Sequence, residues 1–128
     1  MTSGARSPRP RLPAGAKRIC ALADIPDGGG RPFPVEIAGR RATVLLLRRG
    51  RKLFAYADRC PHMEMSLLWD GRLLTAADGE QIRCANHDAH FRVQDGCCVA
   101  GPCLGERLPA LPVRLLNGVV WLLERNPG

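Results

Sequence analysis

The sequence lacks any run of eighteen or more apolar residues, and its first residues contain no apolar segment of the signal-peptide type. A transmembrane helix needs about 20 mostly apolar residues, and a secretory signal needs an apolar core of roughly 7–15 residues. The sequence therefore predicts neither a membrane partner nor export, and we expect a cytoplasmic protein.

Internal repeats and long helical periodicity are also absent from the 128 residues. Instead, the chain contains 14 glycines and 11 prolines, which interrupt regular elements and favour turns. A chain of this length with 45% hydrophobic residues can bury one core. We therefore expect a single, turn-rich and mostly β domain.

Acidic residues are missing from residues 1–18, which hold five of the chain's basic residues. The net charge of +7 is therefore concentrated there, because the remainder balances 14 basic residues against 12 acidic ones. This distribution argues against a nucleic-acid partner. It predicts a disordered basic Pro/Arg-rich tail over 1–18, which either solubilises the chain or helps to dock an acidic partner, followed by a folded domain over 19–128.

Strand-like patterning recurs in short segments. Three dipeptides typical of tight hairpin turns, Asp78-Gly79, Asp95-Gly96 and Asn117-Gly118, separate pairs of them in the second half. The basic run Arg48–Lys52 also lies between two strand-like segments, which indicates a solvated hairpin turn. This pattern predicts an antiparallel meander. The expected strands are 19–23, 33–38, 42–47, 53–57, 73–74, 81–83, 91–93, 98–100, 113–116 and 119–123.

Histidine is scarce, yet two of the three histidines closely follow cysteines, in Cys60-Pro61-His62 and Cys84-Ala85-Asn86-His87. Two thiols and two imidazoles suit a metal centre, and a set of this kind can hold a structural zinc ion. The residues could also simply be buried packing groups. Each pair, however, runs Cys then His within one loop, whereas the common zinc pattern has a cysteine pair followed by a histidine pair.

Between residues 19 and 124 the chain resembles the Rieske 2Fe-2S family, most strongly its small soluble ferredoxins. The segment 60–69 resembles the first Cys-x-His loop, and 87–91 is similar to the family's His-Gly-x-x-Phe. Asp95-Gly96, Gly101-Pro102 and the segment 108–113 resemble the hairpin, proline loop and strand that follow. Two departures are a 21-residue separation of His62 from Cys84 and Asp88 in place of a common glycine.

The resemblance implies one Rieske-type 2Fe-2S cluster, with one iron held by Cys60 and Cys84 and the other by His62 and His87. It also implies an all-β fold, an antiparallel Rieske-type β-sandwich with a small cluster-binding subdomain built from two loops. These loops span about 58–70 and 83–104. In the family, the histidine ligands reach solvent at the tip, where electrons would cross.

Respiratory and photosynthetic members tie the two loops with a disulfide at positions that hold Met65 and Asn86 here. They also place serine and tyrosine hydroxyls, which donate hydrogen bonds to sulfur, where this chain has Ala89 and Phe91. Such donors stabilise the reduced state. Their absence predicts a potential toward the lower end of the family's range of roughly −150 to +300 mV, as in ferredoxins.

A Rieske oxygenase needs a second iron held by two histidines and a carboxylate, and only His90 remains here. We therefore expect no catalytic residues and no enzyme activity of the chain by itself. The favoured function is a one-electron carrier between a flavoprotein reductase and a terminal oxygenase or another redox enzyme. The alternatives are a small subunit or detached domain of an oxygenase or nitrite-reductase-like complex, and a structural zinc module.

The side chains around these motifs have simpler expected roles. Cys20, Cys97, Cys98 and Cys103 should remain reduced without export and serve as packing residues, with a redox-sensitive thiol as the open alternative. We expect His90 at the surface. Trp69 and Phe91 are expected to cover the cluster, and a role of Trp69 in partner docking stays open.

Overall fold

The computed structural model describes residues 12–61, 65–86 and 88–123. These residues form ten strands and one three-residue 3-10 helix, η2 (Leu22–Asp24), so the expected all-β class is confirmed. The strands are β1 (Lys17–Ala21), β2 (Gly30–Ile37), β3 (Arg40–Arg49), β4 (Lys52–Ala57), β5 (Leu74–Ala76), β6 (Gln81–Arg83), β7 (His90–Arg92), β8 (Cys98–Ala100), β9 (Val113–Leu116) and β10 (Val119–Leu122).

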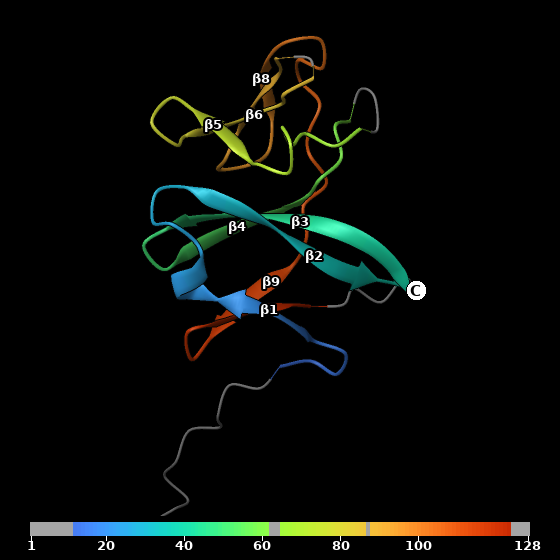
Figure 1. The fold of residues 1–128 in the computed structure, drawn as a ribbon, viewed down its shortest axis with the longest axis vertical. Coiled ribbons are helices and arrows are strands. Elements are labelled where there is room, and N and C mark those ends of the chain that lie inside the picture. The colour runs from blue at the N-terminus through green and yellow to red at the C-terminus, as the bar shows by residue number, and fades with distance from the viewer. Residues whose placement is uncertain (1–11, 62–64, 87, 124–128) are drawn as a thin grey trace, which may run out of the picture.

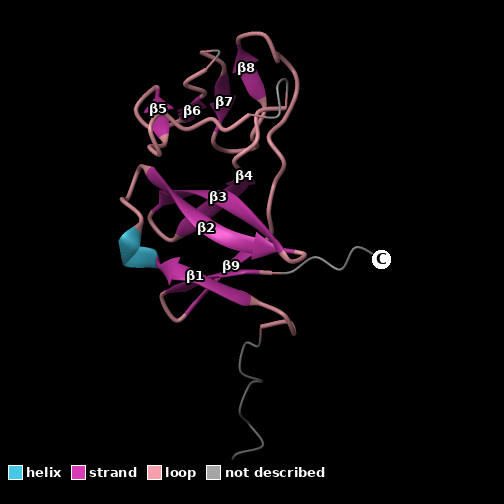
Figure 2. Cartoon of the chain, turned by 45° about the vertical axis from the view of Figure 1, so that its right-hand side comes forward, coloured by secondary structure: helices cyan, strands magenta, loops and turns pink. Residues whose placement is uncertain are grey.

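The strands pair in three antiparallel sheets, with the orders β1-β10-β9, β2-β3-β4 and β5-β6-β7-β8. Figure 1 shows them as successive layers, with the sheet of β1 and β9 at one end and the four-stranded sheet at the other. The turned view in Figure 2 keeps this order, with β2, β3 and β4 between the outer layers. The first two sheets form the sandwich, and the third belongs to the small subdomain.

Strand β3 serves two cores because its side chains alternate between the two faces of the middle sheet. Val44 and Leu46 belong to the core shared with β1 and β10. Leu45 and Leu47 belong to the core shared with the subdomain. All four are at most 1% exposed. The continuous apolar run of β3 is therefore explained by burial on both faces.

The predicted hairpins are confirmed where glycine follows Asp or Asn. Asp78 and Gly79 have φ values of 56° and 85°, and Asn117 and Gly118 have 52° and 76°. Asn117-Gly118 is a two-residue loop between the paired Leu116 and Val119, and positive φ at both residues is the geometry that such a turn needs. Asp78-Gly79 lies inside a four-residue loop, 77–80, between the paired Ala76 and Gln81. The basic run also forms a turn between β3 and β4, as expected. Its Arg48 has a structural role as well, because its guanidinium donates to the carbonyl of Ile25 at 2.9 Å.

The predicted strand boundaries at the start of the domain shift by two residues. β1 begins at Lys17, two residues before the expected boundary, and ends at Ala21. It ends there because η2 follows directly, with the Asp24 carboxylate accepting from the Ala21 N–H at 3.0 Å. Of the segment predicted as a tail, 1–11 lies outside the described residues, and the proposed division at 18/19 otherwise stays a prediction.

A single buried tyrosine joins the middle sheet to the subdomain. The Tyr56 hydroxyl on β4 donates to the carbonyl of Val93, just after β7, at 2.6 Å. Its ring lies against Gly96, where an added Cβ would come within 2.7 Å of the ring edge. The hairpin after β7 therefore needs glycine both for its φ of 75° and for this close approach. Within the described residues, no helix has the length and apolar character needed to cross a membrane.

Candidate metal centre

The two cysteine loops are closed in the same way. The N–H of Cys60 donates to the carbonyl of Met65 at 2.7 Å, and the N–H of Cys84 donates to the carbonyl of Ala89 at 2.8 Å. In both loops the acceptor lies five residues after the cysteine. His62 and His87 fall inside these two closed segments in sequence, but both lie outside the described residues.

Two hydrogen bonds tie the loops to each other. The N–H of Ala85 donates to the carbonyl of Leu67 at 3.1 Å. The side-chain amide of Asn86 donates to the carbonyl of Ser66 at 2.7 Å. Because both acceptors belong to the first loop and both donors to the second, the two cysteine-bearing segments are held in a fixed relation.

The Asp58 carboxylate organises the first loop from the end of β4. One oxygen accepts from the N–H of Leu67 at 2.7 Å, and the other accepts from the Ser66 hydroxyl at 2.5 Å. The Ser66 hydroxyl oxygen in turn accepts from the N–H of Leu68 at 3.1 Å. The polar side chains of the loop thus satisfy its own backbone, and the apolar Leu67 turns into the core, where it is 0% exposed.

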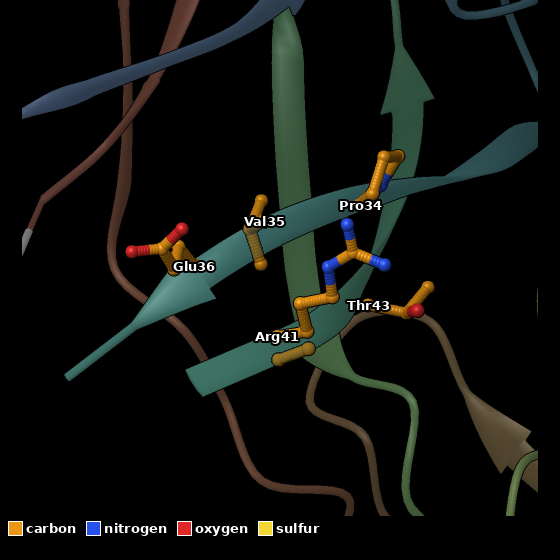
Figure 3. Close-up of a pocket in the computed structure, with 6 residues that line it drawn as sticks. Pro34, Val35, Glu36, Arg41 and Thr43 are labelled. Atoms are coloured by element: carbon orange, nitrogen blue, oxygen red, sulfur yellow. The ribbon is translucent and has the colours of Figure 1, made fainter. Parts of the chain in front are cut away.

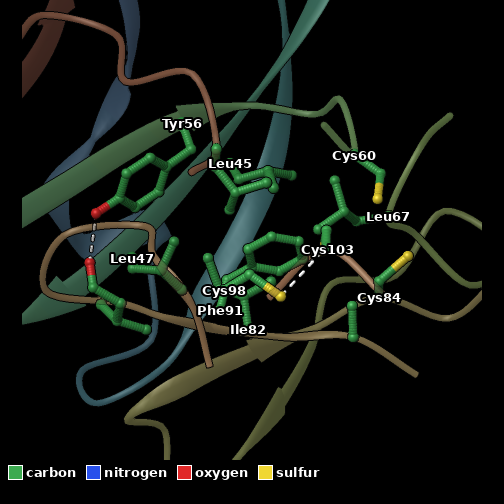
Figure 4. Close-up of a cluster of buried hydrophobic side chains, with 13 residues drawn as sticks. Leu45, Leu47, Tyr56, Cys60, Leu67, Ile82, Cys84, Phe91, Cys98 and Cys103 are labelled. Carbon is green, nitrogen blue, oxygen red and sulfur yellow. Dashed lines mark hydrogen bonds between the residues drawn. The ribbon is translucent and has the colours of Figure 1, made fainter. Parts of the chain in front are cut away.

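The two proposed cysteine ligands lie in the subdomain core. Cys60 is 1% exposed and Cys84 is 0% exposed, and neither forms a disulfide. Figure 4 shows both side chains at the same end of this core, with Leu67 beside them. Thiols from two fixed loops in a water-excluded site fit the sulfur side of the expected cluster. The described residues contain no group of three candidate ligands, so the nitrogen side depends on the two histidines outside them.

The proline loop packs directly on the second cysteine loop. Gly101 has a φ of 101°, and a Cβ added to it would come within 2.7 Å of the Ala89 Cα. No side chain fits between these two backbones. Ala89 and Phe91, the two residues that lack the hydroxyls of other family members, are both 0% exposed. Both positions are therefore fully enclosed by packed protein.

Two further cysteines line the same core. The Cys103 thiol donates to the Cys98 sulfur at 3.0 Å, and the Cys98 thiol donates to the carbonyl of Ala100 at 3.2 Å. Burial, together with the neighbouring Cys98 and Cys60, raises the pKa of Cys103 to about 12. Cys20 is buried in the sandwich core, where burial raises its pKa to about 11. Cys20, Cys98 and Cys103 are buried, as packing residues would be, whereas Cys97 is only half-buried. The role of these four cysteines stays a prediction.

The residue that replaces the common glycine, Asp88, has a φ of 50°. Aspartate tolerates this left-handed conformation better than most residues, which explains how it fills a glycine position. Its carboxylate accepts from the Arg83 guanidinium at 2.6 Å and lies 3.5 Å from His90 Nε2. The hydrogen bond from Arg83 lowers the pKa of Asp88. The other ring nitrogen of His90 faces Gln81 at 3.0 Å, so His90 belongs to a polar network at the subdomain surface.

The two aromatic residues expected to cover the cluster differ in burial. Phe91 lies in the core with Cys60 and Cys84, as expected. Trp69, however, is 62% exposed. Trp69 and Arg72 exchange two backbone hydrogen bonds of 2.9 and 2.8 Å across the Asp70-Gly71 turn, and this small hairpin directs the indole outward. Trp69 lines a hollow together with Arg83 and Ala85, on either side of Cys84 in the sequence. Its role as a cover of the cluster therefore stays a prediction, and its exposure leaves the docking role open.

A hollow of about 560 Å³ lies on β2 and β3, away from the cysteine loops. Figure 3 shows the side chains that line it, which come from β2 and β3. Its lining contains neither cysteine nor histidine, so it offers no ligands for a soft metal. The chemically distinctive part of the described chain is therefore the cysteine-rich core. The hollow is lined by Pro34, Val35, Glu36, Arg41, Ala42 and Thr43.

Comparison with known proteins gives matches that extend over most of the chain. Residues 16–116 match the family model described as "Rieske [2Fe-2S] domain". The chain is 30% identical over 104 residues to the ferredoxin component of the p-cumate 2,3-dioxygenase system of Pseudomonas putida, and this alignment covers 81% of each chain.

Two solved structures have similar folds. The ferredoxin of carbazole 1,9a-dioxygenase from Nocardioides aromaticivorans IC177 matches with a TM-score of 0.67 at 23% identity, over 86% of this chain and 98% of that one. A chain in the complex of reduced oxygenase and oxidized ferredoxin in carbazole 1,9a-dioxygenase matches with a TM-score of 0.66 at 27% identity, over 88% of this chain and 97% of that one.

Proposed function

The chain belongs to the Rieske [2Fe-2S] family, and from that premise we propose that it is a ferredoxin that carries single electrons from a flavoprotein reductase to a terminal oxygenase. It contains one Rieske-type 2Fe-2S cluster. The observation that carries this proposal is the pair of buried thiols, Cys60 and Cys84, on two loops with the same backbone closure.

We assign the four ligands as the sequence suggests. Cys60 and Cys84 hold one iron, and His62 and His87 hold the other. Each histidine falls within a segment that the preceding cysteine closes by its own N–H, which supports the assignment. When bound, the cluster accepts and releases one electron at a time, and mixed sulfur and nitrogen ligation raises its potential above that of an all-cysteine cluster.

The protein residues contribute rigidity and exclusion of water. The cross-loop bonds of Ala85 and Asn86 fix the distance between the two ligand segments, so little rearrangement accompanies a change of charge. Leu67 and Phe91 are fully buried beside the cysteines and keep water from the sulfur side. A low local dielectric strengthens every charge interaction there.

The surface supports transient docking near the loops. The exposed large hydrophobic side chains of the described residues are Met65, Trp69 and Leu104. Met65 and Trp69 belong to the first loop, 58–70, and Leu104 follows Gly101-Pro102 at the end of the second loop, 83–104. A contiguous patch of exposed apolar side chains commonly marks a partner interface, and we propose that these three side chains form one. We propose that reductase and oxygenase bind here in turn, in the cytoplasm.

A free carrier is favoured over a subunit of a larger assembly. The chain covers nearly the whole length of two carbazole-system ferredoxin matches, 98% and 97%. A carrier should elute as a monomer, whereas a subunit should co-purify in a fixed ratio with its partner. Size-exclusion chromatography of protein purified from its own host separates the two cases.

The cluster assignment is tested on anaerobically purified protein. We expect about two iron atoms and two sulfides per chain, and an average g value after dithionite reduction below that of all-cysteine clusters. Cys60→Ser and Cys84→Ser should lose the cluster, and Cys97→Ser, which alters a half-buried cysteine outside the proposed ligand set, should retain it. A colourless protein that holds one zinc ion and no sulfide would establish the zinc module instead.

A further inference from the structure

A hollow of about 400 Å³ lies where the subdomain meets the middle sheet, between the start of β2 and the chain that leads into β5. β5 lies above the start of β2 in both Figure 1 and Figure 2. The lining of the hollow includes two arginines and no acidic residue. It consists of Gly30, Arg31, Pro32, Gly71, Arg72 and Leu73.

The two walls of this hollow are packed on each other. A Cβ added to Gly30 would come within 2.9 Å of Leu73 Cδ2 and within 2.6 Å of the Leu46 carbonyl oxygen. Only a residue without a side chain lets the subdomain approach β2 this closely. The contact fixes Arg31, which follows Gly30, relative to Arg72, which precedes Leu73. The two arginines therefore belong to one site, although they are distant in sequence.

The positive charge of this site is not compensated within the described residues. Arg31 is held from the protein side, because its guanidinium donates to the backbone carbonyl of Asp24 at 3.1 Å and lies 5.5 Å from the centre of the Phe33 ring. Neither Arg31 nor Arg72 forms an ion pair in the described part of the chain, and both are exposed. Asp70, in the neighbouring turn, does not line the hollow.

The hollow borders the proposed apolar patch of Met65, Trp69 and Leu104. Trp69 and Arg72 exchange two backbone hydrogen bonds, so the indole and the guanidinium belong to one small hairpin. Trp69 also lines a second hollow, together with residues on either side of Cys84 in the sequence. A protein that reaches into the arginine hollow would therefore also lie close to Trp69 and to the second cysteine loop.

We propose that the hollow of Arg31 and Arg72 receives acidic side chains of the terminal oxygenase and so orients this partner on the apolar patch. This inference rests on the proposed function as an electron carrier to an oxygenase. The planar guanidinium group matches the two oxygens of a carboxylate and can donate two parallel hydrogen bonds to it. Two arginines without an internal acidic partner thus fit a surface that carries Asp or Glu.

The expected consequence is a faster and better oriented encounter. Complementary charges at the rim of an interface act mainly on the association rate and on its dependence on salt. The apolar patch would provide the buried contact, and the two arginines would guide the approach. The midpoint potential and the rate of transfer within the bound pair should not depend on them.

The test measures the second-order rate constant for reduction of the oxygenase, purified from the same host, by the cluster-loaded carrier in stopped-flow mixing. At about 10 mM NaCl, where charges act over about 30 Å, we expect Arg31→Gln and Arg72→Gln each to lower this constant about threefold. The double variant should lower it about tenfold. At about 1 M NaCl, where the Debye length is about 3 Å, all constants should become equal.

Arg41→Gln is the matched control, because it removes one exposed positive charge from the hollow on β2 and β3, away from the cysteine loops. It should react like the wild type, and Arg72→Lys, which keeps the charge, should retain most of the wild-type constant. Equal slowing in Arg41→Gln would assign the effect to net charge and overturn the proposal. Slowing that persists at high salt would also overturn it. If Arg31→Gln fails to fold, the variants of Arg72 still decide the matter.

Two other occupants of the hollow are distinguished by further measurements. Saturable binding of inorganic phosphate that Arg72→Gln abolishes, with an unchanged oxygenase rate, would assign the hollow to a small anion. Slowing of the reaction with the reductase alone would assign it to that protein. Either result would overturn the assignment to the oxygenase.

Failure of the proposed function is recognised separately. Iron and sulfide analysis and the EPR spectrum report whether the wild-type chain binds the cluster. A wild type without a cluster, or one that passes no electron to the oxygenase, would refute the proposed function. A loaded wild type that reduces the oxygenase at the same rate as both glutamine variants would refute only the role of the arginine hollow.

Discussion

The side-chain amide of Asn86 donates a 2.7 Å hydrogen bond to the backbone carbonyl of Ser66 and so connects the two cysteine loops. Asn86 stands at one of the two positions where the family's respiratory and photosynthetic members carry a disulfide between these loops. The backbone bond from Ala85 to Leu67 lies next to it. In this chain, therefore, hydrogen bonds join the two cysteine loops where those members use a disulfide.

Replacing Asn86 by alanine should loosen this connection. The loss of one partly solvated hydrogen bond lowers the free energy of unfolding by about 1 kcal/mol or less, and the visible absorbance of the cluster should bleach faster in mild denaturant. Met65→Ala is the matched control, because it removes an exposed side chain from the first loop and leaves the carbonyl that closes the loop. Equal bleaching rates for the two variants would show that Asn86 does not hold the loops together.

The second prediction concerns the tyrosine that joins the middle sheet to the subdomain. Tyr56→Phe leaves the carbonyl of Val93 without the 2.6 Å bond of the buried hydroxyl. A buried acceptor left without its donor costs about 1–3 kcal/mol. Denaturant unfolding at neutral pH should show this loss. A variant as stable as the wild type would mean that water or a shifted chain replaces the hydroxyl.

Tyr56 also predicts an alkaline limit of stability. Burial raises the pKa of Tyr56 from 10.0 to about 12. The folded state therefore favours the neutral phenol, while the unfolded chain ionises from about pH 10. The stability from this group is complete below pH 10 and is lost as the pH rises toward 12. Tyr56→Phe has no such group. The difference in the free energy of unfolding between wild type and this variant should therefore shrink between pH 10 and pH 12. A constant difference would contradict the burial of the phenol.

Local chemistry explains which turns could be predicted from the sequence. Asp78-Gly79 and Asn117-Gly118 were predictable because these residue types tolerate the positive φ of a tight hairpin. The turn between β2 and β3 gave no such signal, because its first residue, Ala38, has a φ of 51° that alanine rarely adopts. Its geometry is imposed by the eight paired positions of the long hairpin.

Some features of the site could not be predicted from the sequence, because they depend on which distant segments meet in the folded domain. The spacing of Cys60 and Cys84 from their histidines suggested the metal centre, since a local pattern carries that information. The partner of Asn86 depends on how two distant loops meet, and the outward position of Trp69 depends on the Asp70-Gly71 hairpin. The thiols of Cys98 and Cys103 are close in sequence, yet they share a buried core with Cys60 only in the folded domain.

The third prediction separates the two roles of Asp88. Its φ of 50° favours glycine, while its carboxylate binds Arg83 at 2.6 Å on the exposed surface. Asp88→Gly relieves the backbone and loses the ion pair, so its stability should stay close to wild type. Asp88→Ala loses the ion pair and retains the unfavourable φ, so it should be the less stable of the two. Thermal unfolding of the three proteins gives the order directly, and an alanine variant more stable than the glycine variant would contradict the left-handed backbone.

The fourth prediction concerns electron delivery through the exposed apolar side chains. Trp69 is 62% exposed and Leu104 is 69% exposed, although neither is needed to fill the core. If a partner covers them, Trp69→Ala and Leu104→Ser should slow the reduction of a terminal oxygenase by about 5-fold to 30-fold, because a central apolar anchor contributes about 1–2 kcal/mol to an interface. The midpoint potential should remain unchanged, since both side chains are mostly exposed and neither belongs to the buried core that contains Cys60 and Cys84. Stopped-flow mixing of reduced carrier with oxidised oxygenase measures the rate.

Thr75→Ala is the control for this experiment, because Thr75 is exposed on β5 of the same subdomain and carries no large apolar side chain. It should transfer electrons at the wild-type rate. A slower rate in the Trp69 variant that disappears at saturating oxygenase would locate the defect in binding. A slower rate that persists at saturation would instead locate the defect in the transfer step, and Trp69 would then act by orienting the bound pair. Rates equal to wild type in both apolar variants would show that the partners dock on another face.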